Sequence, residues 1–379
     1  MSPGQLPSDF SESNYGIVMK TEPEQPQLMK GNEALAEAAI RAGLQGYFGY
    51  PITPQSEILE YLSEELPKRG GVVLQAESEL AAINMVYGAS GAGARVMTSS
   101  SSPGISLMQE GLSYMASAQL PCLVVNVNRG GPGLGTIQPS QGDYFQATKG
   151  GGHGDYHLIV LAPSSVQEMA DFVFEGFHLA EQYRNPTMIL ADGALGQMME
   201  KVVLPEPGTL PRLDRPWATT GKPSWRERNI ITSLFIQPEK MEEVNLMLQA
   251  KYQRLQKEVR FETIGVEDAE VLIVAYGLTA RIAQKAMEIA REGGLRVGLL
   301  RPITLYPFPS EAISSIAKRI LSILVVELNA GQMVQDVRLA VNGRRPVYFK
   351  GRMGGMIITA EEIVEELEVL AEDHRLVRV

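Results

Sequence analysis

The sequence contains very few of the residues that bind soft metals. Cys122 is its single cysteine among 379 residues, and its four histidines, His153, His157, His178 and His374, are scattered along the chain. Iron–sulfur clusters and common zinc sites need several such ligands at short, regular spacings. The sequence therefore predicts no metal site of these kinds, and any iron–sulfur cluster that the activity needs is expected on a partner subunit.

Long apolar runs and positive charge are also scarce. No stretch approaches the roughly 18 apolar residues of a membrane span, and the first 27 residues lack the basic start and apolar middle of a signal peptide. The formal net charge of −10 argues against binding to nucleic acid or to an anionic membrane surface. With 44% apolar and 21% charged residues, these features predict an ordinary cytoplasmic protein.

Four parts can be distinguished along the chain. Residues 1–29 are rich in Pro, Ser, Glu and Gln without an apolar period, which predicts a mobile extension or a strap onto another subunit. Residues 30–204 alternate between helical and strand patterns, as in a parallel sheet with helices on both faces. Residues 205–266 form a linker with one long charged helix at 238–260. Residues 267–379 repeat the alternation in a smaller α/β domain.

The periodicity also predicts the boundaries of the main elements. In the first domain, strands are expected at 46–49, 71–75, 94–98, 120–128, 157–163 and 185–192, with helices at 32–42, 56–66, 78–89 and 165–183. In the second, strands are expected at 271–277, 296–302, 322–329 and 346–352, with helices at 278–292, 310–317 and 331–342. The string SSSSPG after the strand at 94–98 predicts a loop that a flat, rigid ligand could approach closely.

One glutamate lies where a predicted strand is followed by a predicted helix. Glu79 begins the string ELAAINMVYGA, whose apolar side chains should partly dehydrate its carboxyl group. Such a carboxyl can share a proton with a ring nitrogen, so Glu79 is a candidate catalytic and cofactor-binding residue. A glutamate that caps the helix beside Ser78 is the more frequent case. Glu77 is a nearby competitor, but it is expected in the exposed turn.

The string YPITP, residues 50–54, presents a hydroxyl group between two prolines just after a predicted strand. Ligands bind at the carboxyl ends of parallel strands, so Thr53 is a candidate substrate-binding residue on a stiff loop. An ordinary proline turn, with Thr53 or Ser56 capping the next helix, explains the same residues and is favoured without other observations.

Arg129 ends the apolar strand CLVVNVN and enters the loop RGGPGLGTIQPSQGD. A guanidinium group there could bind a carboxylate in bidentate fashion, and the glycines would allow close approach of the backbone. A surface or interface arginine beside a flexible loop is the alternative, because GGPGLG lacks the spacing of a phosphate-binding motif.

Three other glycine-containing strings are weaker candidates. KGGGHGDY contains His153, which could titrate near a substrate, although a structural histidine or a partner contact is at least as frequent. ELNAGQM (residues 327–333) and GRMGGM (residues 351–356) lie where strands should end but contain no recognisable catalytic set. These last two strings are interpreted as subunit or interdomain contacts.

Taken together, these strings resemble the alpha subunit of the 2-oxoacid:ferredoxin oxidoreductases. The matching strings are GNEALAEAAIRAG, GYPITPQ, QAESELAAINMVYGASGAGARVMTSSSSPG, RGGPG, GGGHGDY, LAPSSVQE, VVELNAGQM and GRMGGM. They cover residues 30–192 closely and residues 271–359 more loosely. The pairing of SSSSPGISL with GGPGLGTIQPSQGDYFQATKGGGHGD is most similar to the branched-chain, 2-oxoisovalerate (3-methyl-2-oxobutanoate) type.

The resemblance implies a thiamine diphosphate enzyme that converts a 2-oxoacid and coenzyme A to acyl-CoA, carbon dioxide and reduced ferredoxin. It implies a pyrimidine-binding-type domain followed by a transketolase-C-terminal-like domain. Glu79 matches the glutamate that bonds the pyrimidine ring and favours the tautomer that removes the thiazolium C2 proton. Pro51 and Ile52 would contact the same half of the cofactor. Thr53 and Arg129 match residues that orient the substrate carboxylate.

The resemblance also implies half of an active site. The Gly-Asp-Gly motif that holds magnesium and the diphosphate does not occur, since LADGALGQ offers Asp192 and Gly193 without the preceding glycine. A beta subunit is expected to supply the diphosphate site, magnesium and the first iron–sulfur cluster, and small ferredoxin-like gamma and delta subunits could hold further clusters. Alone, the chain is expected to be inactive.

Two alternative functions stay open. The same chemistry on 2-oxoglutarate would favour an additional basic group for the distal carboxylate, and the loops do not distinguish the two substrates. A non-catalytic structural subunit, whose pyrimidine domain only completes an interface, is the alternative from a different class of protein.

Overall fold

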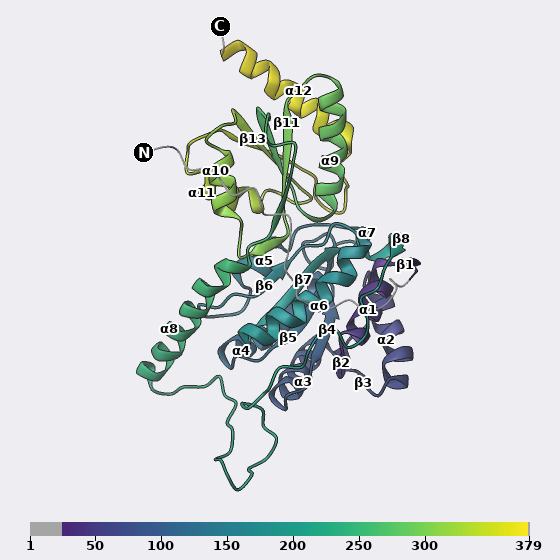
Figure 1. Cartoon of the computed structure of the whole chain (residues 1–379), viewed down its shortest axis with the longest axis vertical. Coiled ribbons are helices and arrows are strands. Elements are labelled where there is room, and N and C mark those ends of the chain that lie inside the picture. The colour runs from purple at the N-terminus through teal and green to yellow at the C-terminus, as the bar shows by residue number, and fades with distance from the viewer. Residues whose placement is uncertain (1–24, 378–379) are drawn as a thin grey trace.

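Two fully buried strands form the centre of the first sheet. Every residue of β5 (Cys122–Asn128) and β7 (Pro186–Asp192) is buried, as expected for strands covered by helices on both faces. The computed structural model describes residues 25–377, and Figure 1 shows the two α/β units that they form. The predicted fold class, a parallel-sheet domain followed by a smaller α/β domain, is confirmed.

The first sheet has seven strands in the order β12-β6-β7-β5-β4-β2-β3. All neighbouring strands are parallel except β12, which pairs antiparallel with β6. Besides β5 and β7, its strands are β2 (Gly46–Gly49), β3 (Val72–Gln75), β4 (Val96–Ser100), β6 (Ile159–Leu161) and β12 (Thr304–Tyr306). Because β12 comes from the C-terminal part of the chain, the second unit closes one edge of the first sheet.

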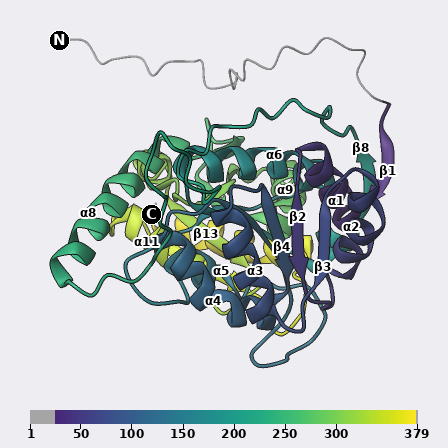
Figure 2. The ribbon, with the colours of Figure 1, turned by 90° about the horizontal axis from the view of Figure 1, so that it is seen from below.

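Helices cover both faces of this sheet. One face of the sheet is covered by α1, α2 and α6, and the opposite face is covered by α3 and α4. Their bounds are α1 (Gly31–Arg41), α2 (Ser56–Lys68), α3 (Glu79–Gly91), α4 (Ser102–Ser117) and α6 (Val166–Tyr183). Figure 2 shows strands between α6 on one side and α3 and α4 on the other. This division follows from the right-handed crossover rule. The connections through α2 and α6 lead across the sheet in one direction, and those through α3 and α4 lead in the other, so the two pairs of helices lie on opposite faces.

The second unit contains a five-stranded sheet in the order β14-β13-β10-β11-β9, in which only β9 is antiparallel to its neighbour. Helices α9 and α12 pack together, as do α10 and α11, and Figure 1 shows the two pairs on opposite sides of the strands. The bounds are β9 (Phe261–Ile264), β10 (Val271–Val274), β11 (Val297–Pro302), β13 (Ser322–Glu327), β14 (Val347–Gly351), α9 (Gly277–Glu292), α10 (Ser310–Ile316), α11 (Met333–Val341) and α12 (Ala360–Val377).

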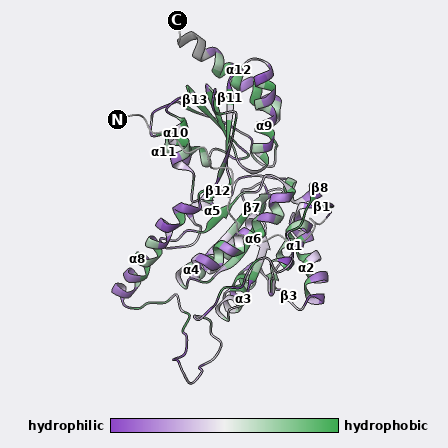
Figure 3. Cartoon of the chain, in the orientation of Figure 1, coloured by the Kyte–Doolittle hydropathy of each residue, from purple (hydrophilic) through white to green (hydrophobic). Residues whose placement is uncertain are grey.

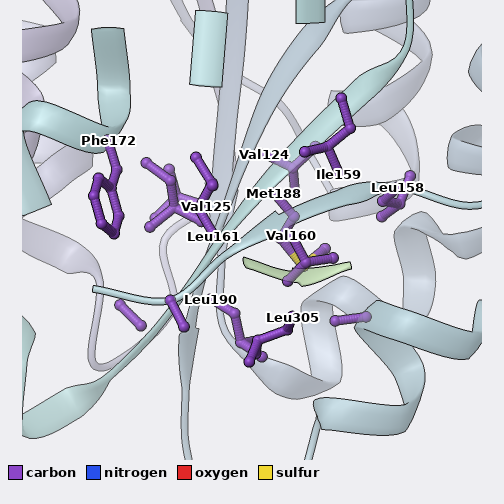
Figure 4. Close-up of a cluster of buried hydrophobic side chains, with 14 of the residues drawn as sticks. Val124, Val125, Leu158, Ile159, Val160, Leu161, Phe172, Met188, Leu190 and Leu305 are labelled. Atoms are coloured by element: carbon purple, nitrogen blue, oxygen red, sulfur yellow. The ribbon is translucent and has the colours of Figure 1, made fainter. Parts of the chain in front are cut away.

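The main hydrophobic core lies between the first sheet and its helices. Figure 4 shows side chains of β5, β6, β7 and β12 within it, including Val124, Leu161, Met188 and Leu305, all of which are buried. In Figure 3 the central strands have the colour of hydrophobic residues, and the exposed helix surfaces carry many hydrophilic ones. Among the helices of residues 25–377, none combines the length and the apolar character that a membrane span requires.

The serine-rich string after β4 is a tight strand-to-helix junction, and the prediction of a loop there was wrong. Ser99 and Ser100 end β4, Ser101 is the N-cap residue of α4, and Pro103 lies in the first turn of the helix. Serine at the N-cap followed by proline is a signal for a helix start. The error came from interpreting Pro-Gly as a turn.

The segments around the first sheet differ from the predicted pattern in several places. The strands β1 (Gln27–Lys30) and β8 (Met199–Val202) pair antiparallel, and β1 includes the end of the extension expected at 1–29. Residues 1–24 of that extension lie outside the described residues. After β8, residues 203–237 run as turns and irregular backbone up to α8 (Pro238–Leu255). Strand β9 then begins inside the range expected to be linker.

One buried glutamine joins the two units. The Gln141 side chain donates to Tyr276 O at 2.8 Å and accepts from Leu328 N at 3.0 Å. Its backbone oxygen accepts from Asn329 Nδ2 at 2.8 Å. Because Gln141 is only 3% exposed, water cannot easily replace these hydrogen bonds. The string ELNAGQM, which contains both Leu328 and Asn329, was interpreted as a subunit or interdomain contact, and these hydrogen bonds make it a contact between the two units.

We expect Gln141→Ala to lower the free energy of unfolding by about 1–3 kcal/mol, since it leaves the buried N–H of Leu328 without its partner. Urea denaturation and thermal unfolding of the purified chain measure the loss. Gln249→Ala is the matched control, because Gln249 is an exposed glutamine on α8. Equal stability of the two variants would contradict this role of Gln141.

Candidate functional site

The candidate residues from three separate strings lie at one edge of the first sheet. Thr53 follows β2, Glu79 follows β3 and Arg129 follows β5. These strands are parallel, so their carboxyl ends meet at the edge where such sheets bind ligands. The N-terminus of α4, which follows β4, lies at the same edge.

Glu79 is buried at the first turn of α3. Its neighbour Ser78 is the N-cap residue, whose hydroxyl oxygen accepts a hydrogen bond from Ala81 N at 3.2 Å. Glu79 is 6% exposed, whereas Glu77 is exposed. Within residues 25–377 no hydrogen bond to the Glu79 carboxylate is found. The cap is therefore Ser78, and the Glu79 carboxylate is available to a ligand.

Gly104 of α4 makes the space for this carboxylate. A Cβ atom on Gly104 would lie 2.0 Å from Ser100 Oγ and 2.4 Å from Glu79 Oε1. Both distances are far below any real van der Waals contact. Because Gly104 has no side chain, the Ser100 hydroxyl group of β4 and the Glu79 carboxylate of α3 can both lie against the first turn of α4.

Several buried polar atoms around this point have no partner in the described part of the chain. They are Ser100 Oγ, Ser101 Oγ, Asn126 Oδ1 and Asn128 Nδ2. Ser100 and Asn126 are paired in the β4–β5 register, so their side chains lie on the same face of the sheet. Since buried polar groups are nearly always hydrogen-bonded, this cluster of donors and acceptors fits a polar heterocycle such as the aminopyrimidine of thiamine diphosphate.

Hydrogen bonds fix the loop that follows β2 and carries Thr53. Gln55 Nε2 donates to Tyr50 O at 3.2 Å, and Gln55 Oε1 accepts from Ser99 Oγ of β4 at 2.6 Å. Asn32 Nδ2 donates to Pro54 O at 2.8 Å. Gln55 is the N-cap residue of α2, and no side chain caps this helix. Thr53 is exposed, and within residues 25–377 its hydroxyl group makes no hydrogen bond, so it is available to a ligand.

Pro51 and Ile52 belong to the same loop as Thr53. Pro51 is exposed and Ile52 is half-buried. Their exposed surfaces extend the edge of the sheet that Glu79 occupies. They are thus placed where a planar cofactor could contact them.

Arg129 connects this loop to the glycine-rich loop that follows β5. Its Nη1 donates to Thr53 O at 2.9 Å, and its Nη2 donates to Leu134 O at 3.0 Å. Its Nε is buried and has no partner within residues 25–377. Arg129 and Thr53, far apart in sequence, are therefore in direct contact, and the guanidinium group has a fixed orientation.

His153 lies away from this cluster. Its ring packs edge-on against Tyr114, with 6.4 Å between the ring centroids. Tyr114 is twelve residues after Ser102 on α4, which corresponds to about 18 Å along a helix. The structure thus places His153 in a contact with α4 and does not bring it to Glu79.

The string GRMGGM reaches the candidate site from the second unit. A Cβ on Gly130 would lie 2.8 Å from Gly355 N, and a Cβ on Gly355 would lie 2.5 Å from Gln138 Cβ. Glycines on both sides therefore let the two loops touch. GRMGGM was interpreted as a subunit or interdomain contact, and the structure places it in a contact between the two units.

Sequence reasoning missed Gly104, Asn126 and Asn128. The two asparagines left a visible signal, because they occupy alternate positions at the end of the otherwise apolar string CLVVNVN. The described residues contain no group of three or more His, Cys, Asp or Glu side chains placed to hold a metal ion.

The fold defines a class of protein in which a thiamine-diphosphate-binding α/β domain is followed by a C-terminal domain with a transketolase-like fold. More specifically, the chain belongs to the 2-oxoacid:ferredoxin oxidoreductase family. The family described as pyruvate flavodoxin/ferredoxin oxidoreductase, thiamine diphosphate-binding, matches residues 37–267. Pyruvate:ferredoxin oxidoreductase core domain II matches residues 269–363.

Two curated relatives show how similarity is distributed within this family. The chain is 51% identical to ketoisovalerate oxidoreductase subunit VorB of Methanothermobacter thermautotrophicus, over 92% of this chain and 98% of the relative. It is 39% identical to 2-oxoglutarate synthase subunit KorA of Archaeoglobus fulgidus, over 90% of this chain and 98% of the relative. Both relatives are named as subunits.

Solved structures agree with this placement. The 2-oxoglutarate:ferredoxin oxidoreductase of Magnetococcus marinus, solved with 2-oxoglutarate, coenzyme A and succinyl-CoA bound, matches with a TM-score of 0.83 and 31% identity, covering 92% of this chain and 66% of that chain. A split-gene transketolase, an inactive beta4 tetramer, matches with a TM-score of 0.57 over 90% of this chain and 97% of that chain. At 14% identity, the second match shows the fold alone.

We expect Gly104→Ala to destabilise the chain by about 1–3 kcal/mol, because the new methyl group must displace Ser100 or Glu79. Thermal unfolding measures the effect. Gly88→Ala on α3 is the matched control, since no atom lies within 4 Å of a Cβ there, and it should leave stability equal or slightly higher. If both variants unfold at the wild-type temperature, the described packing around Gly104 is wrong.

Proposed function

We propose that this chain is the alpha subunit of an enzyme that oxidatively decarboxylates 2-oxoisovalerate. In this reaction the 2-oxoacid loses carbon dioxide and two electrons, and its acyl group forms a thioester with coenzyme A. Two ferredoxin molecules take one electron each, and one proton is released. One observation carries the proposal: a buried carboxylate without a partner, Glu79, shares a sheet edge with Arg129, whose guanidinium group has a fixed orientation.

Thiamine diphosphate, when bound, supplies the carbon nucleophile that attacks the oxo carbon and accepts the electrons released by decarboxylation. The role proposed for Glu79 is to hold a proton between its carboxyl group and the pyrimidine ring nitrogen. Its burial and the space under Gly104 support this role, because a dehydrated carboxyl group forms a strong hydrogen bond. Pro51 and Ile52 would contact the same ring from the loop after β2.

Thr53 and Arg129 are proposed to bind the carboxylate of the 2-oxoacid. The Thr53 hydroxyl group is exposed, and the guanidinium group of Arg129 lies against the Thr53 backbone. A positive charge here would orient the substrate carboxylate and neutralise it before it leaves as carbon dioxide. The hydrogen bonds from Arg129 to two carbonyl groups fix the geometry in advance.

The loops favour a branched apolar side chain on the substrate. Arg129 is the only Lys or Arg in residues 50–55 and 129–142, and one cation is enough for one carboxylate. Leu134 and Ile137 of the same loop expose apolar side chains. A dicarboxylate such as 2-oxoglutarate, which is bound in the Magnetococcus marinus enzyme, would need a second cation. The higher identity to a ketoisovalerate oxidoreductase subunit points the same way.

A beta subunit is proposed to cover this edge and to supply the diphosphate site, magnesium and an iron–sulfur cluster. The loops of the two units expose Leu134, Ile137, Met353 and Met356 beside the site, and the contact between Gly130 and Gly355 brings the loops together. Exposed apolar side chains gathered in this way are typical of subunit interfaces. Small gamma and delta subunits would pass electrons to ferredoxin.

We expect Glu79→Gln to lower turnover by about 10²-fold or more in the assembled complex, because the amide cannot share a proton with the ring. Viologen reduction with coenzyme A, thiamine diphosphate, magnesium and 2-oxoisovalerate measures turnover. Glu77→Gln is the matched control, since Glu77 is exposed two residues away, and it should keep wild-type activity. Unchanged turnover of an assembled Glu79→Gln complex would remove Glu79 from the catalytic machinery.

We expect the wild-type complex to show a kcat/KM for 2-oxoisovalerate at least about tenfold above that for 2-oxoglutarate or pyruvate. One or two methyl groups in an apolar pocket give discrimination of this order, and an unpaired second carboxylate is disfavoured more strongly. The same assay with each acid measures the ratio. Preference for 2-oxoglutarate would contradict the proposed substrate but leave the proposed mechanism unchanged.

A further inference from the structure

A long segment without helix or strand connects β8 to α8, and its residues 205–237 are here called the arm. Loops of this length inside a folded protein are uncommon, and ordered ones usually have a binding function. Figure 1 shows the arm extending away from the sheet and helices of the first unit before the chain reaches α8. The arm therefore presents a surface that the first unit does not cover.

The base of the arm is fixed to the first unit by a buried charge network. Glu181 of α6 accepts from Arg95 Nε at 2.6 Å and from Arg215 Nη2 at 2.5 Å. Arg95 Nη2 also donates to Pro211 O at 3.0 Å. Because Arg95 and Glu181 are buried, water cannot easily replace these contacts, and the base of the arm is held in place.

Beyond this base the arm exposes large apolar side chains. Trp225 is 78% exposed and Ile236 is 88% exposed, and Ile230 and Leu234 are exposed as well. Apolar side chains gathered on one exposed segment are typical of protein interfaces. Tryptophan is also among the residues that contribute most to binding at such interfaces. We therefore expect a protein surface to cover the arm.

Positive charge precedes the apolar residues 230–236. Lys222 and Glu227 pair with each other at 2.9 Å, so these two charges compensate. Arg226 and Arg228 have no carboxylate partner within residues 25–377. Two positive charges thus remain beside the apolar residues, in a chain whose formal net charge is −10.

Negative charge follows the same apolar residues, at the start of α8. Lys240 and Glu243 pair with each other at 2.8 Å. Glu239 and Glu242 have no cationic partner in the part of the chain that the structure describes. The exposed apolar residues of the arm are therefore bordered by two unpaired positive charges on one side and by two unpaired negative charges on the other.

We propose that the arm binds the arm of a second copy of this chain about a two-fold axis close to Leu234. In a two-fold interface the same surface serves both copies, so it must be complementary to itself. An antiparallel arrangement of two arms places the arginines of each copy against the glutamates of the other, with the apolar residues 230–236 of both copies between them. This charge pattern points to a second copy because one surface carries both halves of the match.

A cysteine near the axis tests the pairing in the assembled complex. Cys122 is buried, so an introduced cysteine is the accessible thiol of this chain. Leu234→Cys should form a disulfide between two copies on mild oxidation, because residues near a two-fold axis lie close to their own equivalents. Non-reducing gels and mass spectrometry identify the linked chains. Leu339→Cys is the matched control, since Leu339 is a similarly exposed leucine on α11, and it should not cross-link.

The cross-linking result decides between the possible partners. A disulfide that joins two copies of this chain in Leu234→Cys alone supports the inference. A disulfide to another subunit, no disulfide in a fully assembled complex, or equal cross-linking of the two variants overturns it. None of these outcomes depends on which 2-oxoacid is turned over.

Charge reversal tests the complementarity itself. The variant Arg226→Glu/Arg228→Glu has two acidic ends, and Glu239→Arg/Glu242→Arg has two basic ends. Each should dimerise at least about tenfold more weakly than the wild-type full chain, because like charges then face each other. Mixed in equal amounts, the two variants should dimerise about as tightly as wild type. Sedimentation measures the dissociation constants, and equal behaviour of all samples, or no recovery in the mixture, overturns the inference.

Discussion

The burial of the Glu79 carboxylate against Gly104 is the constraint on which the rest of the site depends. Glu79 is 6% exposed, and within residues 25–377 its carboxylate has no hydrogen-bond partner, so a ligand can supply the missing hydrogen bond. Ser100, Asn126 and Asn128 add further buried atoms without partners around it. The first domain thus carries an incomplete polar site that a nitrogen heterocycle is suited to complete.

The surrounding structure holds this edge in one geometry before any ligand arrives. Gln55 ties the loop after β2 to β4, and Arg129 ties it to the glycine-rich loop. The second unit contributes directly. Gln141 accepts a hydrogen bond from Leu328 N, and Gln332 donates one to Gly142 O. Such preorganisation lets binding free energy orient the substrate instead of ordering the loops.

Much of this arrangement could be predicted from the sequence. Alternating patterns gave the parallel sheet, and the strand-end rule placed Thr53, Glu79 and Arg129 at one edge. The sequence could not show that Gly104 faces Glu79, because clearance for a Cβ depends on how α3 and α4 pack. It could not show β12 either, since that short strand is defined by pairing with β6 from another part of the chain. Nor could it show the contact between Asp143 and Asn126, which are 17 residues apart in sequence.

The most direct test of the proposed catalytic site is a structure of the assembled complex with thiamine diphosphate bound. The Glu79 carboxylate is expected about 2.7–3.2 Å from a nitrogen of the pyrimidine ring, with the diphosphate bound by the beta subunit. A pyrimidine ring bound to a different carboxylate, or bound away from the carboxyl edge of β3 and β4, would contradict the assignment of Glu79.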